Sequence, residues 1–180
     1  PLAHVLRDVI EFAHTLKEAR YILNNRKVLV DGRVIIDPRF PVGLMDVLEI
    51  PEINKRYRIL PSKRHHLTLS EITEEEAKFK LCKIQNISTQ KGGALQLNMH
   101  DGRNIVIDVD DPTKSPDNKY KTNGTVKISI PDQEILEYYS FEEGNEAIVY
   151  EGTNIAHAGK LSKITKRYGV RASIVEIGDV

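Results

Sequence analysis

The chain has 180 residues, of which 40% are hydrophobic and 29% charged, and 26 basic and 26 acidic side chains give it a formal net charge of zero. This balance is typical of a globular protein and excludes an intrinsically disordered chain. No apolar run approaches the ~18 residues of a membrane span, no signal-peptide pattern opens the chain, and the single cysteine excludes an internal disulfide framework and fits a reducing cytosol.

Two helices are expected at the start of the chain. Apolar residues recur at helical spacing over residues 2–13, which predicts an amphipathic helix. Thr15 and Glu18 form a capping-box pattern, because the threonine oxygen can accept a backbone N–H bond and the glutamate can return one. The second helix should expose Lys17 and Arg20 on the side opposite its apolar residues.

A β-hairpin should follow the second helix, and short strands should dominate the rest of the chain. Asp31-Gly32 joins two β-branched runs, and this pair suits the positive backbone angles of a tight hairpin turn. From residue 48 to residue 139, short alternating runs separated by turn clusters predict a small sandwich or barrel. Only Thr73–Lys78 resembles a helical turn, and residues 140–180 again have a strand pattern. The predicted class is α+β, mostly β.

A glycine-rich stretch from Tyr150 to Ile164 is close to a phosphate-binding loop. Gly152 is followed by six residues and then Gly159-Lys160, whereas a phosphate loop has a gap of four and a hydroxyl residue after the lysine. Leu161 stands in place of that hydroxyl, and the next segment has the pattern of a strand, not of a helix. We interpret the glycines as turn positions and expect no ATP or GTP hydrolysis.

Metal binding and nucleophilic catalysis are not indicated either. His65 and His66 are adjacent, so in a strand their side chains would face opposite sides. The other histidines have no partner at a useful ligand spacing. Cys82 lies in an alternating strand pattern and is interpreted as a packed small hydrophobic residue. We therefore expect no catalytic residue, no metal and no cofactor.

Charge is unevenly distributed along the chain. Residues 54–66 hold five basic residues, a tyrosine, two histidines and no acid, and residues 153–175 hold five more basic residues without an acid. Residues 128–159 hold seven acids and no lysine or arginine. Such blocks create local fields that a net charge conceals, and interleaved basic and aromatic residues can contact phosphates and stack on unpaired bases. The pattern favours RNA binding; the alternative is a set of solubilising residues on solvated faces.

Two stretches resemble known RNA-associated modules. TLKEARYILNNRKVLVDGRVIIDP is similar to the helix–helix–hairpin RNA-binding module first described in bacterial ribosomal protein S-four. The positions that carry this resemblance are Thr15, Glu18-Ala19-Arg20, Arg26-Lys27, Gly32 and Pro38. EGNEAIVYEGTNIAHAGKLSKITKR is similar to a KOW motif, a β-hairpin module whose key glycine would be Gly159.

The order of these modules, with the linking stretches FPVGLMDVLEI and EEAKFKLCKI, resembles one family across the whole chain, the archaeal and eukaryotic small-subunit ribosomal protein S-four-e family. The resemblance implies an S-four-type RNA-binding module at residues 1–47, a central β domain at 48–139 and a KOW (SH3-like barrel) domain at 140–180. Family members begin with a basic extension before Pro1 and continue beyond Val180, so we expect a trimmed chain.

The resemblance also implies a function. It implies a structural constituent of the small ribosomal subunit that binds rRNA in translation, is no enzyme, and works on the cytoplasmic ribosome. Its partners would be small-subunit rRNA and neighbouring ribosomal proteins, without a membrane or a small-molecule substrate. The alternatives are an RNA-modifying enzyme or a KOW-type transcription elongation factor that carries an S-four-type RNA-guiding module.

The expected RNA contacts are basic side chains from three segments. By motif position, the first module would contribute Arg7, Lys17, Arg20, Arg26, Lys27 and Arg33, and the KOW hairpin Lys160 and Lys163. The basic block at residues 54–66 would contribute Lys55, Arg56, Arg58, Lys63 and Arg64.

Overall fold

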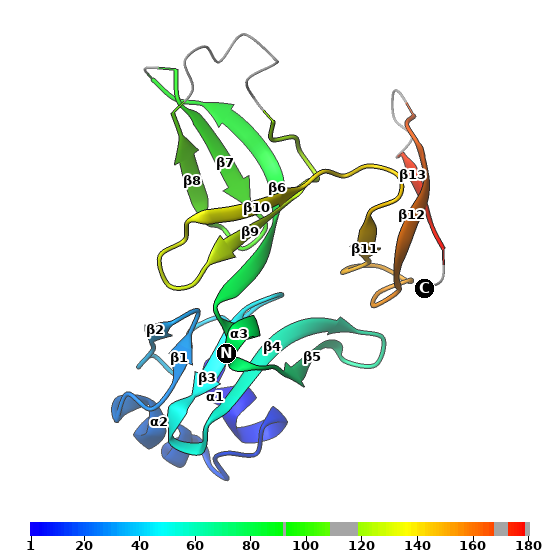
Figure 1. The fold of residues 1–180 in the computed structure, drawn as a ribbon. Coiled ribbons are helices and arrows are strands. Elements are labelled where there is room, and N and C mark those ends of the chain that lie inside the picture. The colour runs from blue at the N-terminus through cyan, green and yellow to red at the C-terminus, as the bar shows by residue number, and fades with distance from the viewer. Residues whose placement is uncertain (92, 109–118, 168–172, 179–180) are drawn as a thin grey trace. The chain divides into compact units, whose positions relative to one another are not determined.

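The computed structural model describes residues 1–91, 93–108, 119–167 and 173–178 (Figure 1). The chain divides into two compact units. The first consists of Pro1–Lys80 with Ile128–Glu134, and the second of Leu81–Lys127 with Ile135–Val180. Among the described helices, none has the length and apolar character that a membrane span requires.

Within the described residues, strands dominate the fold, as expected for a mostly β protein, and they form three sheets. The first has the order β2-β1-β3-β4-β5, the second β10-β9-β6-β7-β8 and the third β11-β12-β13. The strands of the first sheet are β1 (Leu29–Val30), β2 (Arg33–Val34), β3 (Val47–Ile50), β4 (Lys55–Ser62) and β5 (His66–Glu71). Those of the second are β6 (Phe79–Thr89), β7 (Leu95–Met99), β8 (Asn104–Ile107), β9 (Thr125–Ser129) and β10 (Ile135–Tyr139). Those of the third are β11 (Glu146–Ile148), β12 (Ala158–Thr165) and β13 (Ile174–Ile177).

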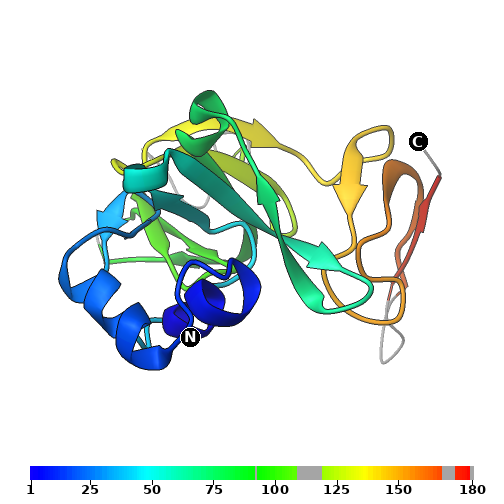
Figure 2. The ribbon, with the colours of Figure 1, turned by 90° about the horizontal axis from the view of Figure 1, so that it is seen from below.

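The helical segments are short. They are α1 (Leu2–His4), the π-helix η1 (Val5–Val9), α2 (Leu16–Asn24), the 3-10 helix η2 (Pro51–Ile53) and α3 (Glu74–Ala77). Figure 2 shows the first helices in blue beside the cyan strands of the first sheet. Their buried apolar side chains form one core with β1 and β3, to which Leu6, Leu23, Val30 and Leu48 belong.

The first predicted helix is shorter than its apolar pattern suggested. The helical segment ends at Val9, and Glu11 has a φ of 58°, which reverses the chain. Phe12 and Ala13 both donate their N–H groups to the carbonyl of Leu6, at 2.9 and 3.2 Å. Ala13 is fully buried although it lies outside the helix, whereas Val9, which belongs to the same apolar pattern, is 51% exposed. The apolar spacing was therefore wrong about the helix length and only partly right about burial.

The predicted Thr15 cap of α2 and the predicted Asp31-Gly32 turn are confirmed, and the capping box is confirmed only in part. Thr15 Oγ1 accepts the N–H of Glu18 at 3.1 Å, but the Glu18 carboxylate accepts from the N–H of His14 and not from Thr15. The hairpin turn between β1 and β2 consists of Asp31 and Gly32, with φ values of 48° and 71°. The turn therefore has the positive angles that favour this pair of residues.

The predicted helical turn near residue 74 is also confirmed. Thr73 and Glu76 exchange side-chain to backbone hydrogen bonds in a complete capping box at the start of α3. Strand β3 lies where the strand-rich part of the chain was expected to begin. β3 is central to the first sheet, and it pairs antiparallel with both β1 and β4.

Candidate nucleic-acid interface

Helix α2 presents a polar face that includes two of the predicted RNA contacts. Ala19, Ile22 and Leu23 are buried in the core of the first unit, whereas Lys17 and Arg20 are exposed. This arrangement confirms the predicted orientation of the helix. It leaves two cations on a rigid element, directed away from the apolar core.

The turn after α2 and the first hairpin add further basic residues. Arg26 is exposed and has a φ of 58°, and Arg33 is exposed on β2. Lys27 is partly exposed and its Nζ lies 2.8 Å from a carboxylate oxygen of Glu52. The predicted contacts of this region are therefore available to solvent, but Lys27 has an intramolecular partner.

Arg7 and Lys55 also lie near the surface with acidic partners. Arg7 donates two side-chain hydrogen bonds of 2.7 Å to the adjacent Asp8, and these bonds raise the pKa of the guanidinium. Lys55 donates to the carboxylate of Glu71 on β5, which raises the pKa of the ammonium. Solvent screens such surface pairs, so an RNA phosphate can replace the carboxylate at little cost in stability.

The rest of the basic block at residues 54–66 divides between the body of β4 and its tip. Arg56 is partly buried, with its guanidinium 3.4 Å from Glu49 and 3.7 Å from Glu74. Lys63 and Arg64 are exposed in the turn between β4 and β5. These two cations are the part of the block that is most open to a ligand.

Arg58 has a different position from the one expected of an RNA contact. Arg58 is only 7% exposed. Its guanidinium donates to the carbonyls of Glu76 at 2.6 Å and Phe79 at 2.9 Å. The guanidinium also lies 4.8 Å from the centre of the Phe79 ring, and burial lowers its pKa. Arg58 therefore binds the chain around the end of α3. Tyr57, the aromatic residue of the same block, packs against the core of the first unit.

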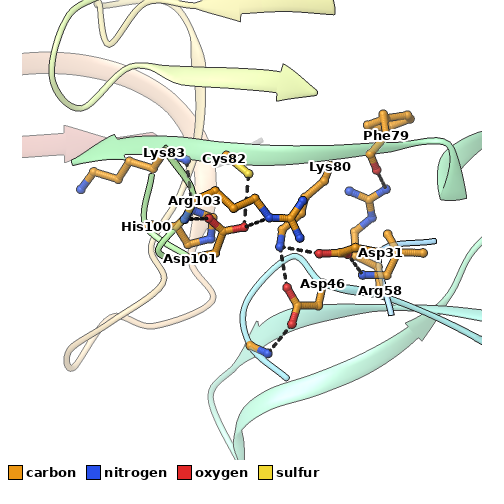
Figure 3. A network of polar contacts seen from close by, with 12 residues as sticks. Asp31, Asp46, Arg58, Phe79, Lys80, Cys82, Lys83, His100, Asp101 and Arg103 are labelled. Carbon is orange, nitrogen blue, oxygen red and sulfur yellow. Dashed lines mark hydrogen bonds and ion pairs between the residues drawn. The ribbon is translucent and has the colours of Figure 1, made fainter. Parts of the chain in front are cut away.

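A buried ionic group lies beneath the first hairpin, and sequence analysis missed it. Figure 3 shows Lys80 Nζ between two carboxylates, 3.0 Å from Asp31 Oδ2 and 2.5 Å from Asp46 Oδ1. The other oxygens of these acids accept the N–H groups of Val47 at 2.9 Å and Gly43 at 2.7 Å. Burial raises the pKa of the Asp46 carboxyl, although Lys80 opposes that change. The group anchors the hairpin turn to the start of β3 and β6.

The third sheet carries the two predicted contacts of the KOW-like stretch. Lys160 and Lys163 are exposed on β12, and they lie in register with Glu146 of β11 and Glu176 of β13. Gly159 is buried beside them. A Cβ at this position would lie 1.7 Å from the carbonyl oxygen of Gly178, so only glycine fits where these chain segments meet.

Cys82, His100 and Asp101 come together in the second unit, with potential ligand atoms within 4.8 Å of one another. Sequence analysis found no partner for His100, because Cys82 lies far from it along the chain. Cys82 is buried, as predicted, and its Sγ lies 3.8 Å from Asp101 Oδ2. Arg103 already provides a positive charge 3.1 Å from that oxygen, and Lys83 donates its N–H to His100 Nδ1 at 3.2 Å. These residues form a polar network in which the guanidinium of Arg103 supplies the positive charge beside Asp101.

The chain is similar in sequence and fold to ribosomal proteins. A family model described as "Ribosomal family S4e" matches residues 53–135. Proteins named "Small ribosomal subunit protein eS4" from Staphylothermus marinus and Ignicoccus hospitalis are each 45% identical to it, over 99% and 100% of this chain and 71% of each relative. The crystal structure of the 30S ribosomal protein S4e from Thermoplasma acidophilum matches with a TM-score of 0.81 and 31% sequence identity. The match covers 97% of this chain and 86% of the Thermoplasma acidophilum chain. Identity of this degree over nearly the whole chain shows that the protein belongs to the ribosomal S4e family.

Proposed function

We propose that this protein is a structural constituent of the small ribosomal subunit and binds rRNA through exposed basic side chains. Relatives that match nearly its full length are named as small-subunit ribosomal proteins, which supports this role. The same membership gives no support to the alternatives, an RNA-modifying enzyme or a transcription elongation factor. The protein would therefore act on the ribosome, with rRNA and neighbouring ribosomal proteins as its partners.

The observation that best supports RNA binding is the division of roles on α2. One side of this helix is fixed in the core by Ala19 and Leu23, and the other side exposes Lys17 and Arg20. Neither cation has an acidic partner within the described residues. Phosphates would gain the attraction of both charges without first displacing a carboxylate, and the helix would not need to rearrange.

The proposed contacts are the predicted basic residues that are exposed and have no ion pair in the described part of the chain. They are Lys17, Arg20, Arg26, Arg33, Lys63, Arg64, Lys160 and Lys163. A second group would exchange an acidic partner for a phosphate, and it consists of Arg7, Lys27, Lys55 and Arg56. Arg58 is left out because its donors are bound to backbone carbonyls in the interior.

We also propose the finer organisation that the sequence indicated. Residues 1–47 correspond to an S-four-type RNA-binding module, residues 48–139 to a central domain and residues 140–180 to a KOW domain. The helices, the Asp31-Gly32 turn and the tight glycine at Gly159 support the first and third of these assignments. These are sequence modules and not separate sheets, because the first sheet takes strands from both sides of residue 48.

The test combines ribosome association with rRNA binding. The protein should co-sediment with the small subunit in a high-magnesium sucrose gradient. For binding to small-subunit rRNA, Lys17→Ala with Arg20→Ala should lower the slope of log affinity against log salt by roughly 1.4–1.8, because each lost phosphate contact removes about 0.7–0.9. The melting temperature should stay unchanged, since both side chains are exposed.

The matched control removes two exposed lysines that are not among the proposed contacts. Lys78→Ala with Lys91→Ala changes the net charge by the same amount, and both positions are exposed. This variant should keep the slope of the unmodified protein. Equal slopes for the two double variants would mean that α2 is not the RNA-binding face.

A further inference from the structure

Tyr21 on α2 is unusually open to solvent. It is 66% exposed, the largest value among the exposed large hydrophobic side chains of the described residues. A tyrosine ring this exposed leaves apolar surface in water, and aromatic residues are usually placed so that the ring is covered. Sequence analysis assigned no role to Tyr21, and the core of the first unit does not use it.

Tyr21 lies on the same face of α2 as the proposed RNA contacts. At about 100° per residue, Lys17, Arg20, Tyr21 and Asn24 fall within an arc of about 100°. The buried side chains of Ala19, Ile22 and Leu23 occupy a similar arc on the opposite side. The ring therefore stands one helical turn from the ammonium-bearing Lys17 and directly beside Arg20 in the sequence.

The position of Tyr21 is also fixed. Asn25 ends the helix, and its side-chain Nδ2 donates to the carbonyl of Tyr21 at 2.7 Å. Within the described residues, the ring makes no aromatic or cation–π contact of the kind that Tyr120, Lys83 and Arg58 take part in. An anchored backbone and an uncovered ring suit a stacking platform, because little order has to be gained when a partner binds.

We propose that Tyr21 stacks on an unpaired RNA base while Lys17 and Arg20 contact the adjoining phosphates. This inference rests on the proposed rRNA-binding function and makes its target more specific. The bases of a continuous A-form helix are stacked on one another, and their edges are hard to reach, whereas bases in loops, bulges and junctions can stack on aromatic side chains. The target of α2 is therefore an unpaired segment of rRNA and not a regular duplex.

The decisive variants are Tyr21→Leu, which keeps an apolar side chain and a good helix former, and Tyr21→Phe, which keeps the ring. The probes are transcribed small-subunit rRNA of Staphylothermus marinus, a 12-nucleotide oligo(A) and a 12-base-pair RNA duplex. Tyr21→Leu should bind the transcript and oligo(A) about fivefold or more weakly, the lower end of what one stacked base contributes. Tyr21→Phe should stay within about twofold of the unmodified protein. Affinity for the duplex should not depend on Tyr21.

The salt dependence separates stacking from phosphate contact. Stacking releases no counterions, so Tyr21→Leu should lower affinity at every salt concentration without changing the slope, whereas Lys17→Ala should change it. Tyr139→Leu removes another exposed tyrosine, on β10, and serves as a control that should bind normally. Melting curves check that each variant is folded.

The possible outcomes distinguish the inference from the function on which it rests. If Tyr21→Leu binds the transcript as tightly as the unmodified protein, or if Tyr21→Phe loses as much as Tyr21→Leu, stacking by the ring is refuted and rRNA binding stands. If Tyr21→Leu weakens duplex and oligo(A) equally, the preference for unpaired RNA is wrong. If the unmodified protein shows no salt-dependent binding to the transcript, the proposed function fails as well.

Discussion

Replacing Lys80 by methionine should strongly destabilise the first unit. Lys80 is completely buried, and its ammonium is the counterion of two carboxylates, those of Asp31 and Asp46, whose side chains are only 5% and 11% exposed. Methionine fills a comparable space without a charge, so the variant would remove the ammonium that lies between the two carboxylates. Removing one partner of a buried ion pair costs about 3–5 kcal/mol.

A triple variant tests whether this cost comes from charge. In Lys80→Met with Asp31→Asn and Asp46→Asn, all three charges are gone. Each asparagine keeps an oxygen that can accept from the N–H of Val47 or Gly43, so these backbone groups stay paired. The triple variant leaves no uncompensated buried charge, so it should recover part of the stability that Lys80→Met loses.

The assay is thermal and urea denaturation followed by circular dichroism. For a chain of this length, 3–5 kcal/mol corresponds to a fall in melting temperature of roughly 6–20 °C in Lys80→Met. A loss below about 1 kcal/mol would mean that the carboxylates are not held apart from water as the geometry implies. A triple variant no more stable than the single one would show that packing, not charge, explains the cost.

Two further predictions concern Gly159 in the third sheet and the pH dependence of Asp46 in the buried ionic group. Gly159→Ala should destabilise the third sheet by about 1–3 kcal/mol, because the new methyl group would overlap the carbonyl of Gly178, and thermal unfolding should show the loss. Gly43→Ala is the control, since a Cβ there meets no atom within 4 Å. Burial raises the pKa of Asp46, so the fold binds this proton more tightly than the unfolded chain does, and the stability gained in this way should be lost as the pH rises from below 3.8 through the folded pKa. The stability of the unmodified protein relative to Asp46→Asn should fall over that range, and a difference that stays constant with pH would contradict this.

The features that could be predicted from sequence are those decided by neighbouring residues. The Asp31-Gly32 turn depends on the angles of two residues, and the Thr15 cap on a contact with a residue three positions away. The structure confirms both. Glu18 shows where such reasoning ends, because its carboxylate accepts from the N–H of His14 and not from that of Thr15.

Apolar periodicity predicted the first segment only in part, because Val9 is 51% exposed although it belongs to the apolar pattern. Residues 2–13 were expected to form one helix because apolar side chains recur at helical spacing. Ala13 is buried as expected, but the chain reverses at Glu11 and brings it back to the core by another path. A periodic pattern favours the burial of one set of side chains, but more than one backbone path can satisfy it.

Lys80 and Arg58 could not be assigned from composition, because a basic residue in a charged block is usually on the surface. A signal for Lys80 was present, since in β6 it shares its phase with Cys82 and Ile84, which are both fully buried. What the sequence could not provide was its partners, because Asp31 and Asp46 are 49 and 34 residues away. Long-range charge pairing is a property of the fold.

This division of cations is compatible with the proposed RNA-binding face on a chain with no net charge. Lys80 and Arg58 are directed inward and hold the turns and carbonyls that shape the first unit. Many surface acids lie against basic neighbours, as Glu52 does with Lys27. The exposed cations of α2, Lys17 and Arg20, are left without such neutralisation in the described chain. The electrostatic field that rRNA would meet therefore depends on which cations lack an acidic neighbour. The equal totals of 26 basic and 26 acidic residues conceal this local field.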